Sequence, residues 1–524
     1  MPDDKIRFDR DTALKQIRQR SDPWDVIIIG GGATGVAAAM DAASRNLHTL
    51  LVERFDFGQG TSSRSTKLVH GGVRYLQQGN LTLVRDALQE RSLLARNAPH
   101  TVHALPFIIP CANWFSRLYY WIGLKLYDLL GRSAPFTRSR ALSADAVEKR
   151  LPTLRRQWVR GGVQYSDGQF DDARLLIDMA STAAEQGGCL VNHANVTNLR
   201  KDHSGRIIGV QIRDEETGLT ADVQGRAVIN ATGPFCDAVR QRDLAESEPL
   251  VAASQGVHLT LPKRFFPGDA ALMIPKTSDG RVLFVIPWLD HVLVGTTDTA
   301  IPEAVAEPQA RQQEIDFLLS TAGEYLNEAP SRTDVLSVFV GIRPLVMNDP
   351  SARTASLSRD HQVVVSDTGL ISITGGKWTT VRKMAEDVID RAIQSAGLTG
   401  NPCVTKDLHI TATREKEKRH LAITGAAPAA ATVSEKEVSI EEQRIHANFP
   451  ETTADVIRAV RFEMARTVED FLARRSRALF LNASASVEMA PRVASIMAEE
   501  LKRDQQWEAQ QVANFAELAA TYHA

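Results

Sequence analysis

The sequence predicts an α/β chain with a Rossmann-like dinucleotide-binding domain, a second domain built on a mixed sheet, and an α-helical C-terminal cap. Three observations predict this fold class. An apolar run at residues 25–29 leads into glycines at 30–35 and an alanine-rich stretch, and a second apolar run ends at Glu53. Short strand-like runs alternate with turns between residues 100 and 360, and helical periodicity begins near residue 441. A strand–helix–strand opening is typical of an α/β protein.

The composition is that of a globular protein. Of the 524 residues, 43% are hydrophobic and 24% are charged, and the net charge is −2, which argues against a disordered chain and against binding nucleic acid through bulk positive charge. The four cysteines lie far apart, so we expect no disulfide framework, no metal site and a reducing compartment. No apolar run has the length of a transmembrane helix, and the N-terminus lacks the apolar core of a secretory signal.

The chain divides at changes in composition. The alanine-rich segment Ala-Ala-Pro-Ala-Ala-Ala, surrounded by mixed charges, is typical of a linker. The expected divisions are a charged leader (1–23), a cofactor domain interleaved with a substrate domain (24–411, the substrate part mainly 100–200 and 250–345), a linker (412–440) and a helical C-terminal domain (441–524).

The glycines Gly30, Gly32 and Gly35 form a G-x-G-x-x-G pattern directly between a strand and a helix. This pattern gives a tight turn, lets the backbone approach a pyrophosphate and lets the helix pack closely on the strand. Glu53 ends the second strand, where a carboxylate is expected to bind the adenosine ribose. The alternative is a glycine turn that only packs an α/β unit. The turn alone does not choose between FAD and NAD.

Two further glycine turns favour FAD and a domain of the glutathione-reductase type. Gly233 follows the strand-like run at 227–231, and Gly375 and Gly376 follow another at 371–374, with Thr379 at the start of the next helix. A flavin extends across the sheet, and a second helix N-terminus near its ring can stabilise the reduced anion. The alternative for the Gly375–Gly376 turn is an ordinary strand–helix corner.

Residues 61–75 read TSSRSTKLVHGGVRY and are dense in hydroxyl groups. Because they come just after Glu53, we expect them to line the cofactor site, with Thr61, Ser62, Ser63 and Lys67 as binding residues. A plain polar loop is the alternative.

With these motifs in place, the sequence resembles the FAD-dependent glycerol-3-phosphate dehydrogenases, a branch of the D-amino-acid-oxidase-like flavoproteins. The resemblance spans about residues 24–480, and its motifs include VIIIGGGATGVAAAMDAASR, TSSRSTKLVHGGVRYL, YSDGQFDDARL, VGIRPLV, SRDH, GGKWTTVRKMAEDVID and RFEMARTVEDFLARRSRALFL. It implies oxidation of sn-glycerol 3-phosphate to dihydroxyacetone phosphate by hydride transfer from C2 to N5 of FAD, with electrons passed to a membrane quinone. It also implies a cytoplasmic protein bound peripherally to the inner membrane, and it leaves a homodimer open. No D-x-[DN]-x-[DN]-G calcium loop occurs, so calcium control is not expected.

The substrate carries a phosphate dianion, which requires cationic donors. The resemblance gives this role to Arg343, Arg359, Lys377 and Arg74, and places Tyr75 beside Arg74. The alternative for each arginine is a weak surface ion pair.

The reaction also needs a group that takes the proton of the C2 hydroxyl. His258 is the first candidate and His70 the second, although a structural histidine is the common case. Because a guanidinium does not readily lose its proton, Arg343 is assigned to orienting the C2 oxygen or to holding phosphate. Lys377 is a candidate for a place beside flavin N5.

Residues 114–130 are unusually aromatic and include Arg117 and Lys125. One helical face would carry Phe115, Leu118, Tyr119, Ile122, Leu126 and Leu129. This pattern is typical of a helix in a membrane interface, and the alternative is a core helix packed on the substrate sheet.

Three rival functions stay open at this point. An oxidase of the same architecture would use O₂, and peroxide formation would reveal it. An amine oxidase acting on glycine or sarcosine would need a carboxylate clamp in place of phosphate-binding cations. An FAD-binding scaffold without activity is disfavoured because the candidate catalytic groups gather on loops.

Overall fold

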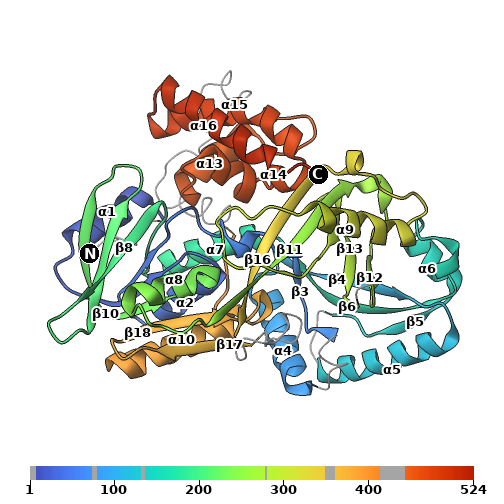
Figure 1. Ribbon diagram of the computed structural model, residues 1–524, viewed down its shortest axis with the longest axis horizontal. Coiled ribbons are helices and arrows are strands. Elements are labelled where there is room, and N and C mark those ends of the chain that lie inside the picture. Colours follow the sequence, from blue (N-terminus) through green and yellow to red (C-terminus); the bar gives the residue numbers. More distant parts are fainter. Residues whose placement is uncertain (1–7, 74–79, 132–135, 278–279, 348–359, 413–442) are drawn as a thin grey trace.

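The computed structural model describes residues 8–73, 80–131, 136–277, 280–347, 360–412 and 443–524. It contains two large sheets, with the first at the left of Figure 1, the second at the right, and the C-terminal helices above both. This arrangement confirms the predicted fold class. The expected linker falls almost entirely outside the described residues.

The first sheet is the expected dinucleotide-binding sheet. Strand β1 pairs in parallel with β2 on one side and β10 on the other, and β10 pairs in parallel with β18. Residues Val26, Ile27 and Ile28 are completely buried, as expected of a parallel strand covered on both faces. The strands of this sheet are β1 (Trp24–Ile29), β2 (Thr49–Val52), β7 (Cys189–Val191), β8 (Ala194–Lys201), β9 (Ile207–Asp214), β10 (Thr220–Asn230), β17 (His361–Val365) and β18 (Leu370–Gly375).

Helices pack against this sheet. Helix α2 (Ala33–Ser44) contacts both α7 (Asp172–Glu185) and α10 (Val381–Ala396), and its alanines allow close packing. Helix α1 (Arg10–Gln19) buries Ala13, Leu14 and Ile17 in a separate apolar cluster with β1 and β7. Part of the expected leader therefore belongs to this domain. Helix α8 (Cys236–Asp243) follows β10.

The second sheet is the mixed sheet expected in the middle of the chain. Its longest pairing joins β11 and β16 in antiparallel register, with His258 opposite Phe339. The strands are β3 (Leu68–Val69), β4 (Val102–Pro110), β5 (Arg140–Leu142), β6 (Gly162–Phe170), β11 (Val251–Pro262), β12 (Ala271–Ile274), β13 (Leu283–Trp288), β14 (His291–Gly295), β15 (Thr299–Ala300) and β16 (Ser337–Val346). The sequence predicts a substrate domain that includes residues 100–200, but of these residues only the strands up to β6 belong to the second sheet. The part from α7 to β8 instead packs with the first sheet, because β7 extends the parallel pairing of β2.

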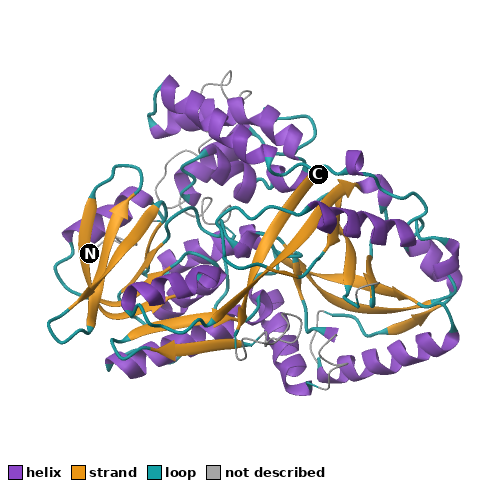
Figure 2. Cartoon of the chain, viewed as in Figure 1, coloured by secondary structure: helices purple, strands orange, loops and turns teal. Residues whose placement is uncertain are grey.

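Figure 2 shows the helices that flank the second sheet. Helices α4 (Leu81–Asn97) and α5 (Trp114–Leu130) lie along its lower edge in the view of Figure 1, while α6 (Ala144–Arg150) lies at its right end and α9 (Gln312–Tyr325) lies above it. Helix α5 buries only Leu124 and Tyr127 and exposes most of its large apolar side chains. Its buried side packs on the second sheet, where Tyr127 contacts Tyr165 of β6, and its other side is exposed.

The C-terminal helices form the predicted helical cap. They are α13 (Thr453–Glu463), a π-helical turn (Asp470–Arg475), α14 (Ala478–Leu481), α15 (Ala483–Leu501) and α16 (Gln505–Ala520). Phe480 packs on Phe339 of the second sheet with ring centroids 5.0 Å apart, so the two parts share one apolar core.

Candidate active site

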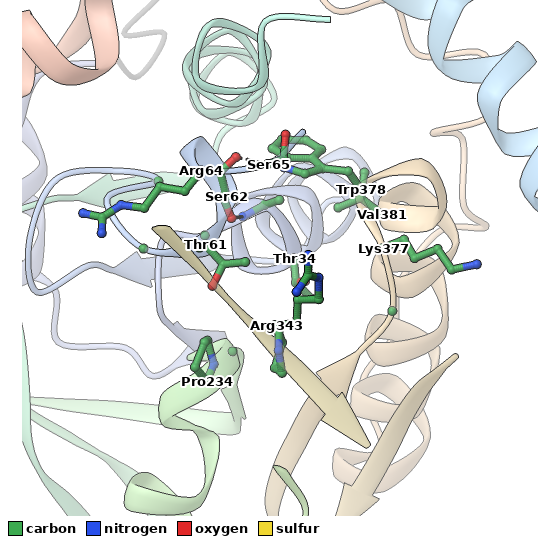
Figure 3. Close-up of a pocket in the computed structure, with 18 of the residues that line it drawn as sticks. Thr34, Thr61, Ser62, Arg64, Ser65, Pro234, Arg343, Lys377, Trp378 and Val381 are labelled. Atoms are coloured by element: carbon green, nitrogen blue, oxygen red, sulfur yellow. Dashed lines mark hydrogen bonds between the residues drawn. The ribbon is translucent and has the colours of Figure 1, made fainter. Parts of the chain in front are cut away.

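A cavity of about 670 Å³ is lined by residues from both sheets and from the loop between β2 and β3. This size is typical of ligand sites, which span about 300–1,000 Å³. Figure 3 shows Thr34, Thr61 and Ser62 near its centre, with Arg343 below them and Lys377 to one side. The sequence-predicted residues that line it are Gly30, Gly32, Glu53, Thr61, Ser62, His70, Gly233, His258, Arg343, Gly375, Gly376, Lys377 and Thr379.

The glycine turn between β1 and α2 has the geometry that the pattern predicts. Gly30 has a φ of +105°, a value that side chains rarely adopt. A Cβ atom on Gly35 would lie 1.9 Å from the carbonyl oxygen of Gly30, so only glycine lets the helix start this close to the strand. Helix α2 begins at Ala33, and its N-cap residue Gly32 has no side chain to cap it, while Ser62 accepts a hydrogen bond from Ala33 N–H at 2.8 Å. The helix N-terminus therefore faces the cavity.

Glu53 holds the shape of this turn. One carboxylate oxygen accepts from Gly31 N–H at 2.5 Å and the other from Phe55 N–H at 2.8 Å. Burial raises the pKa of Glu53, and these two backbone donors oppose the rise. The carboxylate borders the cavity where the ribose is expected, and ribose binding stays a prediction.

The second glycine turn, Gly375–Gly376, also lines the cavity. Gly375 and Gly376 have φ values of +78° and +75°, and a Cβ atom on Gly376 would lie 2.3 Å from the sulfur of Met384. After the turn, Trp378 donates to the carbonyl of Ser62 at 2.9 Å. Thr379 accepts from His70 N–H at 3.1 Å, so this turn contacts the loop that bears His70.

Arg343 on β16 lies in the cavity lining beside β11. Its guanidinium donates to Thr296 Oγ1 at 3.0 Å and lies 3.7 Å from a carboxylate oxygen of Asp298. A Cβ atom on Gly256 would lie 2.4 Å from this guanidinium, so glycine at that position leaves room for the arginine. Arg343 is therefore held in place while it lines the cavity.

His258 lies two residues after Gly256 on the same strand. Its ring stacks on Phe339 with centroids 4.9 Å apart, and its Nε2 lies 2.8 Å from Thr66 Oγ1. Burial, Arg343 and Lys67 together hold the pKa of His258 well below its usual value of 6.5. The imidazole is therefore neutral near pH 7 and can accept a proton.

His70 and Lys377 also border the cavity. His70 is half-buried, whereas His258 is 2% exposed, so His70 is the more accessible of the two candidate bases. The side chain of Lys377 extends away from Arg343 in Figure 3. The two cations therefore flank different parts of the lining.

Three predicted cofactor residues do not line the cavity, which corrects the sequence analysis. Lys67 is fully buried, and its ammonium donates to Asp172 at 2.8 Å and to the carbonyl of Ser63 at 2.7 Å. Neither Lys67 nor Ser63 lines the cavity, and Gly35 packs against Gly30 without lining it. Arg74, Tyr75 and Arg359 lie outside the described residues.

Sequence reasoning missed several lining residues. Thr66 contacts His258, and Arg281 contributes another cation to the lining. Thr66 lies within the hydroxyl-rich block and could have been chosen there. Nothing local marks Arg281, since only the pairing of β12, β13 and β14 brings that part of the chain to the cavity.

One group in the described chain could in principle ligate a metal, namely Asp56, His193 and Asp470. Asp56 already accepts from Arg474 and Arg475 at 2.6 Å, and His193 lies 2.9 Å from Asp470. These side chains form an ion-pair network, and we assign no metal to it.

The lining fits FAD. It offers the N-terminus of α2 at Gly32 for the pyrophosphate, a carboxylate at Glu53, and a second glycine turn at Gly375–Gly376. Hydroxyls of Thr61 and Ser62 border the space between the two turns.

Comparison with known families agrees with this geometry. Residues 25–382 match the family described as FAD dependent oxidoreductase, and residues 366–508 match the C-terminal domain of alpha-glycerophosphate oxidase. The fold and the cavity thus define an FAD-dependent oxidoreductase.

Individual relatives indicate which kind of FAD-dependent oxidoreductase the chain is similar to. A mitochondrial glycerol-3-phosphate dehydrogenase of Arabidopsis thaliana is 40% identical over 96% of this chain and 87% of its own length. The human mitochondrial glycerol-3-phosphate dehydrogenase is 39% identical over 93% of this chain and 72% of its own length. The crystal structure of the glycerol-3-phosphate dehydrogenase of Bacillus halodurans, complexed with FAD, is 28% identical with a TM-score of 0.75, covering 98% of this chain and 97% of that one. The chain belongs to the FAD-dependent glycerol-3-phosphate dehydrogenases, which confirms the resemblance and the predicted cofactor.

Proposed function

We propose that the cavity binds FAD and sn-glycerol 3-phosphate and that the protein oxidises this substrate at C2 to dihydroxyacetone phosphate. When bound, FAD accepts the hydride from C2. The observation that carries the proposal is the junction of two elements in one cavity: a dinucleotide cradle from the first sheet, and Arg343 with His258 from the second.

Arg343 orients the substrate by binding either the oxygen on the substrate's C2 or the substrate's phosphate. Its contacts with Thr296 and Asp298 hold the guanidinium against the sheet, so little conformational freedom is lost on binding. Lys377 supplies a second positive charge from the other side of the lining. Arg74, Tyr75 and Arg359 remain candidates on the resemblance alone.

His258 takes the proton of the C2 hydroxyl. Its neutral form is held by burial and by the nearby positive charges, so the base is ready near pH 7. His70 is the second candidate, since it borders the same cavity and is more exposed.

The first experiment is a visible spectrum of the purified protein without oxygen, before and after sn-glycerol 3-phosphate is added. We expect a flavin band that bleaches with this substrate and does not bleach with glycine or sarcosine. A band that persists would contradict the substrate, and no band after FAD is added would contradict the cofactor site. Rapid peroxide formation in air would favour the oxidase.

Arg343→Ala tests the role of the guanidinium. Losing a charged hydrogen bond costs about 1.5–3 kcal/mol, so we expect KM to rise roughly 10- to 150-fold while FAD stays bound. The control is Arg226→Ala, which removes a guanidinium that is 60% exposed and lies outside the cavity lining. An unchanged KM in Arg343→Ala would remove the assignment.

We further propose that the electrons pass to a membrane quinone and that α5 docks on the membrane. Among the described residues, no helix is both long and apolar enough to cross a bilayer. Helix α5 nevertheless exposes Trp114, Phe115, Tyr119 and Leu129 by 59–66% each, and Arg117 and Lys125 accompany them. Aromatic and apolar side chains with adjacent cations favour the headgroup region.

Vesicle binding tests this surface. Replacing Trp114, Phe115 and Trp121 by serine should abolish co-sedimentation with vesicles of anionic and zwitterionic phospholipid, while flavin bleaching in solution is retained. The matched control replaces Leu219, Leu244 and Leu289, which are exposed on other loops, by serine. Equal binding by both triple variants would contradict docking through α5.

A further inference from the structure

His258 has one polar contact that leads towards the cavity. The ring is 2% exposed and stacks on Phe339. Its Nε2 lies 2.8 Å from Thr66 Oγ1, whereas its Nδ1 is buried and has no hydrogen-bond partner among the described residues. His258 and Thr66 both border the cavity, and the Thr66 hydroxyl offers a polar path from a substrate hydroxyl to Nε2.

Thr66 occupies the position that such a contact requires. Thr66 is half-buried and lines the same cavity as Arg343, and its Oγ1 faces the imidazole of His258. A hydroxyl can donate one hydrogen bond and accept another at the same time.

The residues on both sides of Thr66 are fixed by Asp172. Ser65 donates to this carboxylate through its backbone at 3.1 Å and through its hydroxyl at 2.7 Å. Lys67 donates to it at 2.8 Å, and Arg477 from the C-terminal domain donates at 3.0 Å. Because Asp172 is completely buried, this cluster holds the loop rigidly and fixes the position of Thr66.

We propose that Thr66 is a catalytic residue that relays the proton of the C2 hydroxyl to Nε2 of His258. The proton of the substrate hydroxyl moves to Thr66 Oγ1 as the proton of Oγ1 moves to Nε2. The C2–H electron pair leaves as hydride to FAD, and the C2–O bond becomes a carbonyl. This relay rests on the proposed function, in which His258 is the base.

The surrounding charges keep the imidazole of His258 in its neutral, proton-accepting form before the reaction. Arg343 on β16 and Lys67 on the loop both act on His258 and disfavour the imidazolium. The imidazole therefore starts neutral and releases the proton again after the reaction, which a relay through a hydroxyl at the cavity allows.

The test compares Thr66→Val with Thr66→Ser. Valine keeps the shape and removes the hydroxyl, whereas serine keeps the hydroxyl. General-base catalysis contributes about 10²–10⁴-fold, so we expect the anaerobic rate of flavin bleaching to fall by about 100-fold or more in Thr66→Val and to stay within about threefold in Thr66→Ser. The control Thr182→Val removes a buried threonine hydroxyl from α7, away from the cavity, and should leave the rate unchanged.

Two further measurements separate chemistry from structure. The dissociation constant of dihydroxyacetone phosphate, read from the shift of the flavin band, should change by no more than about fivefold in Thr66→Val, since one neutral hydrogen bond is worth about 1 kcal/mol. The thermal midpoint should match that of Thr66→Ser. A rate loss shared by the valine and serine variants, or explained by weaker binding, would overturn the relay.

His258→Gln distinguishes the relay from the proposed base. If this variant bleaches at the normal rate, the assignment of His258 as base fails, and the relay fails with it. If it is slow while Thr66→Val is fast, the base stands and the relay is overturned. Slow bleaching in both, with recovery in Thr66→Ser, supports the relay.

Discussion

The loop at residues 56–67 is held from two sides by different means. On the side of the cofactor turn, Gly58 N–H donates to the carbonyl of Gly31 at 3.0 Å, and Ser62 accepts from Ala33. On the opposite side, arginines of the C-terminal domain reach the same loop. Arg474 and Arg475 bind Asp56, and Arg477 binds the carbonyl of Ser63 at 2.9 Å.

The two contacts depend on opposite properties of the side chains. The turn at residues 30–35 forms because Gly30 and Gly35 have no side chains, so the backbone segments around them pack closely together. The C-terminal contact works because long charged side chains are buried and paired, since Arg474, Arg477 and Asp172 are each at most 1% exposed. A buried ion is tolerated only when its partners are in place. An added side chain should therefore disrupt the contact at the glycine turn by steric overlap, whereas removal of a charge partner should disrupt the contact with the C-terminal domain.

Asp172→Asn should have the largest effect, because it leaves Lys67 and Arg477 buried without their anion. Removing one partner of a buried ion pair costs about 3–5 kcal/mol. We expect a large fall in the thermal midpoint of the holoenzyme, measured by circular dichroism.

The control for this variant is Asp407→Asn. Its ion pair with Arg96 is exposed, at 83% and 56% of the two side chains, and such pairs contribute about 0–1 kcal/mol. Equal midpoints for the two variants would show that the buried cluster does not stabilise the loop.

Gly35→Ala disrupts the glycine turn on the cofactor side. The added Cβ would overlap the carbonyl of Gly30, and overpacking of this kind costs about 1–3 kcal/mol. We expect weaker FAD retention on gel filtration and a smaller fall in the midpoint than in Asp172→Asn. Gly123→Ala is the control, because its Cβ would meet nothing within 4 Å and alanine favours a helix. Full FAD retention in Gly35→Ala would contradict the steric argument.

The cofactor side could be predicted from the sequence because its signals are local. Gly30, Gly35 and Glu53 lie within one strand–helix–strand unit, and their spacing alone indicates the turn. The second sheet could be expected only in outline, since its strands come from residues 68 to 346 and their order depends on long-range pairing. Arg343 and His258 were chosen through the family resemblance, and the pairing of β11 with β16 places them in one cavity.

Lys67 shows why part of the site could not be read from the sequence. A lysine in a polar loop beside a cofactor site predicts an anion contact, and the lysine does bind an anion. That anion is Asp172, which is 105 residues away in the chain, and Arg477 shares it from a further domain. Buried ion pairs between distant segments leave no periodic pattern, so neither partner could be identified before the fold was known.

The thermal midpoint measured over a pH series distinguishes the two contacts, because the contact with the C-terminal domain includes the ion pair of His193 with Asp470. Burial would lower the pKa of His193, but Asp470 at 2.9 Å outweighs it and raises this pKa above 6.5. The folded protein therefore binds the proton more tightly than the unfolded chain does. The stabilisation is fully present below pH 6.5 and is lost as the pH rises through the raised pKa.

His193→Gln should accordingly lower the thermal midpoint more at pH 6 than at pH 9. A hydrogen bond between charged groups is worth about 1.5–3 kcal/mol, so the difference should be smaller than the loss in Asp172→Asn. Gly35→Ala provides the comparison: its defect is steric and should be the same at both pH values. If His193→Gln lost equal stability at pH 6 and pH 9, the protonated pair with Asp470 would not contribute, and the C-terminal contact would depend on the arginines alone.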